Sequence, residues 1–161
     1  MTSGSVGSKI EFPHFADILL RIVPDLPRPV VESLWSAHRA QCYSRAEYLL
    51  RVGEASQGIF LIASGLVRLS LSNDHPKPQE IHYRELRSPA LLGVNDVMLG
   101  SSVSLSAQAQ TEVRCAFIPK TVFLETVRRF PQAGLAFSQL IAQELTSTYS
   151  RISELRGASS V

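Results

Sequence analysis

The spacing of apolar side chains predicts a helical start to the chain. Residues 15–22 carry apolar side chains at intervals of three and four, and Pro24 follows them, so we expect an amphipathic helix that ends there. A second helix is predicted to begin near Pro29, because proline suits the first helical turn. We expect Trp35 on its apolar face to pack into the core. The residues predicted to share that face are Val31, Leu34, Trp35 and His38.

Between residues 42 and 117 the apolar period falls to two, the repeat of β-strands. Strand-like segments are predicted at residues 48–52, 59–71 and 81–86, with loops at 53–58 and 72–80 and an irregular stretch at 87–100. Within 59–71, Ser64-Gly65 is typical of a hairpin turn in which glycine supplies a positive φ.

Residues 103–117 show the cleanest alternation, which predicts one or two half-buried strands. The apolar positions are Val103, Leu105, Ala107, Ala109, Val113, Cys115 and Phe117. Many short strands separated by turn signals indicate a sandwich, jelly roll or barrel.

The end of the chain returns to helical spacing. Pro119 is predicted to open a short helix, and Pro131 a long one that carries Arg156 in its last turn and stops at Gly157. At 1.5 Å per residue the long helix would measure about 39 Å, more than a small β-domain covers. Its 4-3-4-3 apolar repeat predicts a homodimer seam, and packing wholly against its own domain is the alternative. The seam residues are Ile141, Leu145, Thr148, Ile152 and Leu155.

Composition indicates one globular domain, because 45% of the 161 residues are hydrophobic and 19% are charged. We divide it into a flexible leader (1–12), a β-domain with N-terminal helices (13–130), and a C-terminal dimerisation helix with a tail (131–161). No apolar run reaches the roughly 20 residues that span a bilayer, and the N-terminus has no secretion signal, so we expect a cytoplasmic protein without membrane contact. A net charge of +2 is too small to argue for nucleic acid.

Catalytic and metal-binding motifs are missing from the sequence. Cys42 and Cys115 lie in apolar strand-like segments and are expected to be reduced and buried. The four histidines show no His-x-His spacing, and no Gly-x-Ser-x-Gly elbow occurs, so we predict no enzyme, no metal and no cofactor. A site of two histidines and one carboxylate stays open on sequence alone. The histidines are His14, His38, His75 and His82.

One stretch carries a family resemblance. Residues 53–69 run from Gly53-Glu54 through Phe60-Leu61 to Gly65-Leu66. This order resembles the signature of cyclic-nucleotide-binding domains, the sensor half of catabolite-activator-type (Crp/Fnr) regulators, and the resemblance extends over about residues 15–155. It implies a double-stranded β-helix, or jelly roll, with short N-terminal helices and a long C-terminal helix.

The resemblance also implies a function. In the family the last helix pairs with its twin in a parallel dimer and passes a ligand signal to a DNA-binding domain. The chain ends at Val161, so we expect no recognition helix and no direct DNA binding by this chain. Heme sensors share the family fold, which makes Cys42 and His82 ligand candidates by analogy; a colourless purified protein would remove that reading.

The phosphate-binding cassette of the family is only partly matched. Ligand-binding members hold the cyclic phosphate with Phe-Gly-Glu and an arginine about ten residues later, because a buried anion needs charge-assisted hydrogen bonds. The match here is Leu92-Gly93-Val94-Asn95, and the arginine position falls on Val103 or Ser104. No lysine or arginine occurs in residues 88–113. Loss of one such bond costs about 1.5–3 kcal/mol, so cyclic AMP binding through this cassette is disfavoured.

Three alternatives remain for the pocket. An arginine could reach in from a neighbouring strand, the candidates being Arg68, Arg84 and Arg87. Polar side chains could line a pocket for a neutral ligand, or form only a solvent face; these are Ser101, Ser102, Ser104, Ser106 and Gln108. The pocket could also be filled by side chains.

The sequence therefore predicts a regulatory sensor of an unknown small molecule or protein partner. The alternatives are a true cyclic-nucleotide sensor with an unusual phosphate grip and a ligand-free dimerisation or protein-interaction module.

Overall fold

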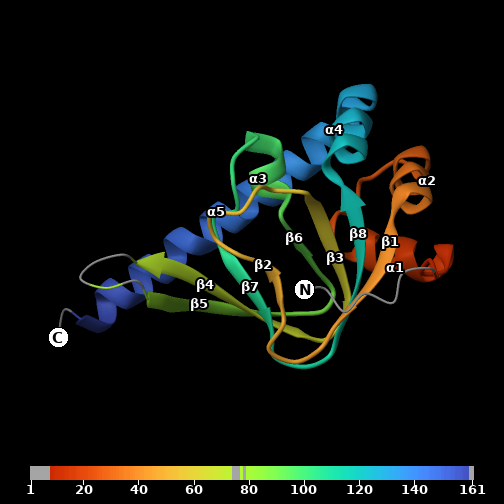
Figure 1. The fold of residues 1–161 in the computed structure, drawn as a ribbon. Coiled ribbons are helices and arrows are strands. Elements are labelled where there is room, and N and C mark those ends of the chain that lie inside the picture. Colours follow the sequence, from red (N-terminus) through yellow and green to blue (C-terminus); the bar gives the residue numbers. More distant parts are fainter. Residues whose placement is uncertain (1–7, 74–76, 78, 160–161) are drawn as a thin grey trace.

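Two antiparallel four-stranded sheets and a set of covering helices make up the fold (Figure 1). The structure is a computed structural model that describes residues 8–73, 77 and 79–159. The helices are α1 (Phe12–Ile22), α2 (Arg28–Ala37), α3 (Val94–Leu99), α4 (Lys120–Arg129) and α5 (Pro131–Ser159). The strands are β1 (Arg39–Tyr43), β2 (Tyr48–Leu50), β3 (Gly58–Ser64), β4 (Leu66–Asn73), β5 (Gln79–Arg87), β6 (Ala90–Leu92), β7 (Ser106–Ala109) and β8 (Val113–Pro119).

The strand order confirms the predicted β-roll. The first sheet has the order β1-β8-β3-β6 and the second β2-β7-β4-β5. Neighbours in each sheet are far apart in sequence, as in the pair β3 and β8, where Phe60 lies opposite Phe117. The two sheets face each other across an apolar interior, and the helices gather on one side (Figure 1).

The two central strands of the first sheet, β3 and β8, are buried on both faces. In β3, Phe60 and Ile62 point into the roll between the sheets, whereas Ile59 and Leu61 point toward the helices. Strand β8 divides its side chains in the same way, with Cys115 and Phe117 inward and Ile118 toward the helices. A strand with two covered faces needs apolar residues at successive positions, which explains the continuous Ile59-Phe60-Leu61-Ile62 run.

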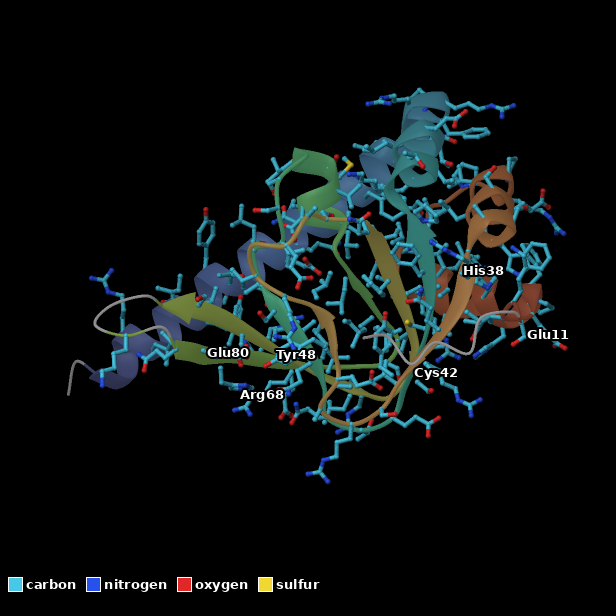
Figure 2. All side chains as sticks on the ribbon, in the orientation of Figure 1. Glu11, His38, Cys42, Tyr48, Arg68 and Glu80 are labelled. Atoms are coloured by element: carbon cyan, nitrogen blue, oxygen red, sulfur yellow. The ribbon has the colours of Figure 1, made fainter. Side chains whose placement is uncertain are left out.

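The second sheet has one face in the interior and one toward solvent. Val67, Leu69, Ala107 and Ala109 lie in the interior. The outer face carries polar side chains, among them Arg68, whose Nε donates to His82 Nδ1 at 2.9 Å. Tyr48, Arg68 and Glu80 project on the same side of the roll (Figure 2). This sheet therefore shows the alternation that sequence analysis predicted.

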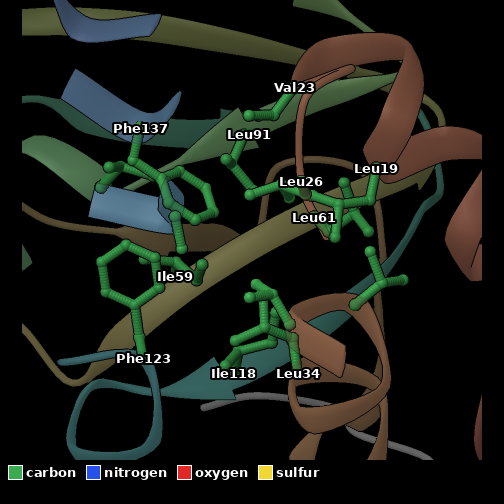
Figure 3. Packing of buried hydrophobic residues seen from close by; sticks show 14 of the residues in the cluster. Leu19, Val23, Leu26, Leu34, Ile59, Leu61, Leu91, Ile118, Phe123 and Phe137 are labelled. Carbon is green, nitrogen blue, oxygen red and sulfur yellow. The ribbon is translucent and has the colours of Figure 1, made fainter. Parts of the chain in front are cut away.

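A helical layer packs on the outer face of the first sheet and forms a second core (Figure 3). Helices α1 and α2 contribute Leu19 and Leu34, and α4 contacts α5 through Phe123 and Phe137, whose ring centroids lie 4.8 Å apart. Only the first turns of α5 enter this core, because its apolar residues beyond Ile141 are outside the cluster. No helix of the described residues is both long and apolar enough to cross a membrane.

The segment before α1 is attached to the end of α2. Lys9 Nζ donates to the carbonyl oxygens of Trp35, Ser36 and His38, and Trp35 Nε1 donates to the Ile10 carbonyl at 2.7 Å. A lysine at a helix C-terminus satisfies the last carbonyls and complements the helix dipole. Residues 9–12 therefore differ from the expected flexible leader, and residues 1–7 of that leader lie outside the described residues.

His38 connects these two segments from a buried position. Its ring is 2% exposed, stacks on Phe15, and accepts the Ile10 N–H at Nε2 at 3.0 Å (Figure 2). Because Nε2 accepts, Nδ1 carries the proton and donates to the Trp35 carbonyl. Burial lowers the pKa of His38, the bond to Trp35 opposes that shift, and nearby Lys9 adds to it. The native state therefore holds a neutral imidazole.

Several predicted boundaries were wrong. The segment between the strands is shorter than the predicted loop at 72–80, because β4 extends to Asn73 and β5 begins at Gln79. These two residues pair with each other. The stretch 87–100 is not irregular: it contains β6, which pairs with β3, and α3. Helix α5 does not stop at Gly157 but continues to Ser159. Strand β6 and helix α3 are too short to leave a periodic signal in the sequence, and the ends of β4 and β5 depend on pairing with each other.

The predicted positive φ at Gly65 is confirmed, but the predicted hairpin is wrong. Strands β3 and β4 belong to different sheets and do not pair, so Ser64-Gly65 carries the chain from the first sheet to the second. Gly65 has φ +110°, and a Cβ there would lie 2.5 Å from the Glu112 carbonyl oxygen. Glycine is therefore required both by the backbone conformation and by the close approach of the loop before β8.

The neutral state of His38 predicts a pH dependence of stability. Its pKa in the folded protein lies below the ordinary 6.5, so the unfolded chain binds the extra proton first. Stability should be constant above about pH 6.5 and fall as pH drops below that value toward the lowered pKa. Urea unfolding at about pH 7.5, 6.5 and 5.5 should show a smaller loss for His38→Asn than for wild type. The exposed His14→Asn is the control. If the free energy of unfolding falls with pH as steeply in His38→Asn as in wild type, the assignment of a neutral, buried His38 is contradicted.

Candidate functional site

A pocket lies where the roll, α3 and α5 meet. Its volume is about 360 Å³. The predicted cassette residues Leu92, Gly93, Val94, Asn95 and Ser104 all line it, whereas Val103 does not. Apolar side chains form most of the remaining wall: Leu50, Leu69, Leu86, Leu91, Leu105, Leu140, Ile141 and Leu145. The structure therefore brings the sequence-predicted site together into one cavity.

The shape of the cassette follows from its glycine. Strand β6 ends at Leu92, and Gly93 has φ +89°, which turns the chain into α3. A Cβ at Gly93 would lie 2.9 Å from the Gly58 carbonyl oxygen, so the β6–α3 corner can sit against β3 only without a side chain. Val94, in the position of the family glutamate, is 5% exposed and belongs to the helical-side core.

The signature turn at Gly53-Glu54 is hydrogen-bonded to the far end of the cassette. The Gly53 N–H donates to the Val103 carbonyl at 3.0 Å, and the Val103 N–H donates to the Glu54 carbonyl at 2.9 Å. Val103 is therefore a buried backbone anchor and not a ligand residue. Its neighbour Ser104 is the residue that occupies the predicted arginine position.

Asp96 is the pocket-lining residue that sequence reasoning missed. It is 5% exposed, and its carboxylate accepts hydrogen bonds from Ser104 Oγ at 2.8 Å and from the Ser104 N–H at 3.3 Å. Its backbone carbonyl accepts the Ser101 N–H at 3.1 Å. One carboxylate thus fixes the loop between α3 and β7. The only sequence signal was an acidic residue two positions after the unmatched glutamate.

The charge of the site follows from this contact. In the family pattern, the position of Ser104 holds an arginine that pairs with a phosphate. Here Ser104 is neutral and is bonded to the buried Asp96 carboxylate, so the charged side chain next to this position is an anion. Two like charges a few ångströms apart in a poorly solvated site repel by several kcal/mol, on the order of 4 kcal/mol at 4 Å for an effective dielectric constant near 20.

Of the three candidate arginines, only Arg84 lines the pocket. Arg68 is on the outer face of the second sheet, bonded to His82, and Arg87 does not reach the cavity. Arg84 shares the wall with Glu144 of α5. Burial raises the pKa of the Glu144 carboxyl, and the charge of Arg84 partly offsets that effect.

Helix α5 closes one side of the pocket. The Tyr83 hydroxyl and Thr148 Oγ1 are hydrogen-bonded at 2.8 Å, which holds α5 along β5. Of the predicted seam residues, Ile141 packs partly on the helical-side core and Thr148 faces β5, so these two contact their own domain. The other three, Leu145, Ile152 and Leu155, are at least half exposed.

The other polar candidates have structural places outside the pocket. Ser106 is buried, contrary to the expected solvent face, because its Oγ accepts the Val52 N–H at 3.1 Å. Gln108 Nε2 donates to the Ala46 carbonyl at 3.0 Å. Ser101 and Ser102 do not line the cavity. Of the five polar candidates, Ser104 alone belongs to the site.

The cysteines and histidines do not line the pocket. Cys42 and Cys115 are free thiols; Cys115 is buried as expected, whereas Cys42 is only partly buried. Burial raises the pKa of Cys115 to about 12, so that thiol stays protonated. His14 is exposed on α1, and His75, the loop histidine of the four considered as metal ligands, lies outside the described residues. Within the described ranges, no three histidine, cysteine, aspartate or glutamate side chains gather as a metal site would require.

The role of Asp96 gives a prediction on stability. Asp96→Asn leaves the residue size unchanged but removes the charge that accepts both Ser104 donors, so it should lower the free energy of unfolding by about 1–3 kcal/mol. The exposed Asp25→Asn should change it by less than about 0.5 kcal/mol. Chemical denaturation measures both, and equal small effects would show that the carboxylate does not hold the loop.

Several solved structures have a similar fold. A cyclic nucleotide-binding domain from Methylobacillus flagellatus has a TM-score of 0.74 at 20% identity, covering 94% of this chain and 86% of that one. The Thermus thermophilus catabolite activator protein has a TM-score of 0.70 at 22% identity, covering 84% of this chain and 62% of its own. The sensor domain of the transcriptional regulator DNR from Pseudomonas aeruginosa has a TM-score of 0.70 at 17% identity, covering 89% and 94%. The chain thus spans less than two thirds of the Thermus protein.

Comparison of the sequence with family models and curated proteins gives one match. No curated protein matches the chain. The model described as the cyclic nucleotide-binding domain matches residues 40–130, more than half of the chain and the whole of the roll from β1 to α4. Together with the sheet order and the position of the cassette, this match shows that the chain belongs to the cyclic nucleotide-binding domain family.

Proposed function

We propose that this domain is a Crp/Fnr-type regulatory sensor whose ligand is a neutral or weakly polar small molecule and not a cyclic nucleotide held by its phosphate. The observation that carries the proposal is the buried Asp96 carboxylate bonded to Ser104, at the point where the family pattern places the phosphate-binding arginine. A cyclic phosphate bound there would face the negative charge of Asp96 and would have no arginine at residue 104 to pair with.

The pocket wall supports a neutral ligand. Leucine and isoleucine side chains dominate the lining. The other lining side chains are the neutral polar Tyr83, Asn95, Ser104 and Thr148 and one cation with two acidic groups, Arg84, Asp96 and Glu144. Pockets of this kind bind small molecules by apolar contact and use a few polar groups for orientation. At about 360 Å³ the cavity has the size of a small-molecule site.

The position of α5 supports a signalling role. Leu140, Ile141 and Glu144 contribute to the wall, so a ligand in the pocket would contact the helix directly. The same helix continues beyond the roll with exposed apolar side chains. A ligand that bound one placement of α5 more tightly than another would shift the population of that placement. The structural likeness to a catabolite activator protein and to the sensor domain of a transcriptional regulator fits such a role.

A second candidate function is a true cyclic-nucleotide sensor with an unusual grip. One observation favours it: Arg84 of β5 lines the pocket and supplies a cation that an anionic ligand would need. The third reading, a ligand-free module, predicts that no small molecule stabilises the domain.

A thermal-melt series distinguishes the first two. A ligand at 100 times its Kd stabilises by about 2.7 kcal/mol, a shift of several degrees for a domain of this size. We expect no shift with cyclic AMP or cyclic GMP at about 1 mM. A shift that is lost in Arg84→Ala would establish the second candidate and reject the proposal.

Rebuilding the cassette is a sharper test of the same site. Val94→Glu with Ser104→Arg restores the family residues, but Asp96 would pair with the new arginine. We therefore expect Val94→Glu/Asp96→Asn/Ser104→Arg to bind cyclic AMP at least tenfold more tightly than the matched Val94→Glu/Asp96→Asn, since one charge-assisted bond contributes about 1.5–3 kcal/mol. Titration calorimetry measures both. Equal affinity in the two folded variants would show that Ser104 does not face the ligand.

We further propose that the domain forms a homodimer through the distal half of α5. Leu145, Tyr149, Ile152 and Leu155 form one exposed apolar stripe beside the face that contacts the roll. The stripe replaces Thr148 of the predicted seam by Tyr149, because Thr148 is already bonded to Tyr83. Exposed apolar residues at heptad-like spacing are typical of paired helices.

Sedimentation of variants with introduced charges tests the dimer. Leu145→Glu with Ile152→Glu should convert a dimer to a monomer, because two carboxylates from each copy would be buried in the seam. Gln143→Glu with Ser147→Glu adds the same charge on the opposite side of α5 and should leave the dimer intact. A wild-type chain that sediments as a monomer at about 100 μM would contradict the proposal.

A further inference from the structure

A second cavity opens at the other end of the roll. Its volume is about 450 Å³, and it shares no lining residue with the cassette pocket. It lies between β1, the start of β3, the end of β8 and the first turn of α4. Its wall consists of Arg39, Gln41, Tyr43, Leu49, Gln57, Phe60, Phe117, Pro119, Lys120 and Thr121. Nothing in the family pattern or in the cassette assigns a role to it.

The floor of this cavity is aromatic. Tyr43 meets Phe60 with ring centroids 6.4 Å apart, and Phe60 meets Phe117 at 5.1 Å, so the three rings form one continuous surface. All three are at least 94% buried, which fixes their orientation and leaves only a small part of each ring open to the cavity. An aromatic or planar ligand would gain edge or face contacts with these rings beyond simple burial.

The rim of the cavity is basic. Arg39 and Lys120 are exposed, and the lining contains no aspartate or glutamate. The ion pairs found among the described residues involve neither of them. The Arg39 guanidinium lies 5.2 Å from the centroid of the Phe117 ring, so its charge is held at the edge of the aromatic floor. Two cations without an acidic neighbour in the cavity select for an anion.

Neutral donors complete the wall. The Tyr43 hydroxyl donates to Gln41 Oε1 at 2.7 Å, which engages the amide oxygen and leaves the amide hydrogens of Gln41 as donors. Lys120 is fixed at the entrance because its backbone N–H donates to the Gln57 carbonyl at 3.0 Å. The cavity therefore combines donors and positive charge at its mouth with an apolar floor.

We propose that this cavity binds a small aromatic carboxylate. The carboxylate would lie between Arg39 and Lys120, and its ring would rest on Phe60 and Phe117. Arginine matches the geometry of a carboxylate with two parallel hydrogen bonds. The aromatic floor disfavours a phosphate or another fully hydrated anion, which would gain nothing from it. The site stands independently of the cassette pocket and of what that pocket binds.

The test uses 2-naphthoate as the probe and the neutral 2-naphthamide as its match. We expect saturable shifts of backbone amide signals in β1 and at the start of α4 in NMR titrations of the whole chain, with a Kd below about 1 mM. The amide probe should bind at least tenfold more weakly, because it lacks the charge. Equal binding of the two probes, or no saturation by about 5 mM naphthoate, would overturn the proposal.

Variants place the binding event. Arg39→Ala with Lys120→Ala should weaken naphthoate at least tenfold, whereas Arg45→Ala removes an exposed charge outside the cavity and should have no effect. All three residues are on the surface, so the variants should keep the wild-type spectrum elsewhere. Binding that survives Arg39→Ala/Lys120→Ala but is lost in Arg84→Ala would assign the probe to the cassette pocket and reject the second site.

Discussion

The central strands of the first sheet, β3 and β8, are apolar on both faces, and this is the constraint on which the rest of the molecule depends. Strand β3 sends Phe60 into the roll and Ile59 into the helical layer, and β8 does the same with Phe117 and Ile118. Because this sheet must be covered twice, the second sheet closes one side and the helices close the other. The first turns of α5 are held in the helical layer by Phe137, and this attachment makes the helix a wall of the pocket.

Asp96 changes what that pocket can do. A cassette that holds a phosphate keeps its loop in place through the ligand, with charge-assisted bonds to the anion. In this domain the carboxylate of Asp96 makes the corresponding bonds to Ser104 within the protein. The loop therefore has its shape without a ligand, and mainly apolar side chains line the remaining cavity. This arrangement supports the proposal that the ligand is not held by a phosphate.

The sequence predicted what local periodicity encodes. The run at residues 59–62 and the glycine at Gly65 were readable because strand burial and turn conformation depend on adjacent residues. Asp96 was missed because its partner, Ser104, is brought to it by the turn of α3 and not by spacing. The apolar repeat placed Thr148 in a predicted dimer seam, because such a repeat does not reveal which surface covers a residue. In the structure the Thr148 hydroxyl is hydrogen-bonded to the Tyr83 hydroxyl. The second cavity joins β1 to α4, and only the sheet order brings them together.

We propose that the Asp96–Ser104 contact replaces the phosphate grip of the family, and the Ser104 and Gly93 amide signals would report a phosphate bound at the cassette. In an NMR titration with cyclic AMP to about 5 mM, a range that detects even weak ligands, both signals should stay at their ligand-free positions. A saturable shift of both signals, with one common Kd, would place the phosphate at the cassette and contradict the account.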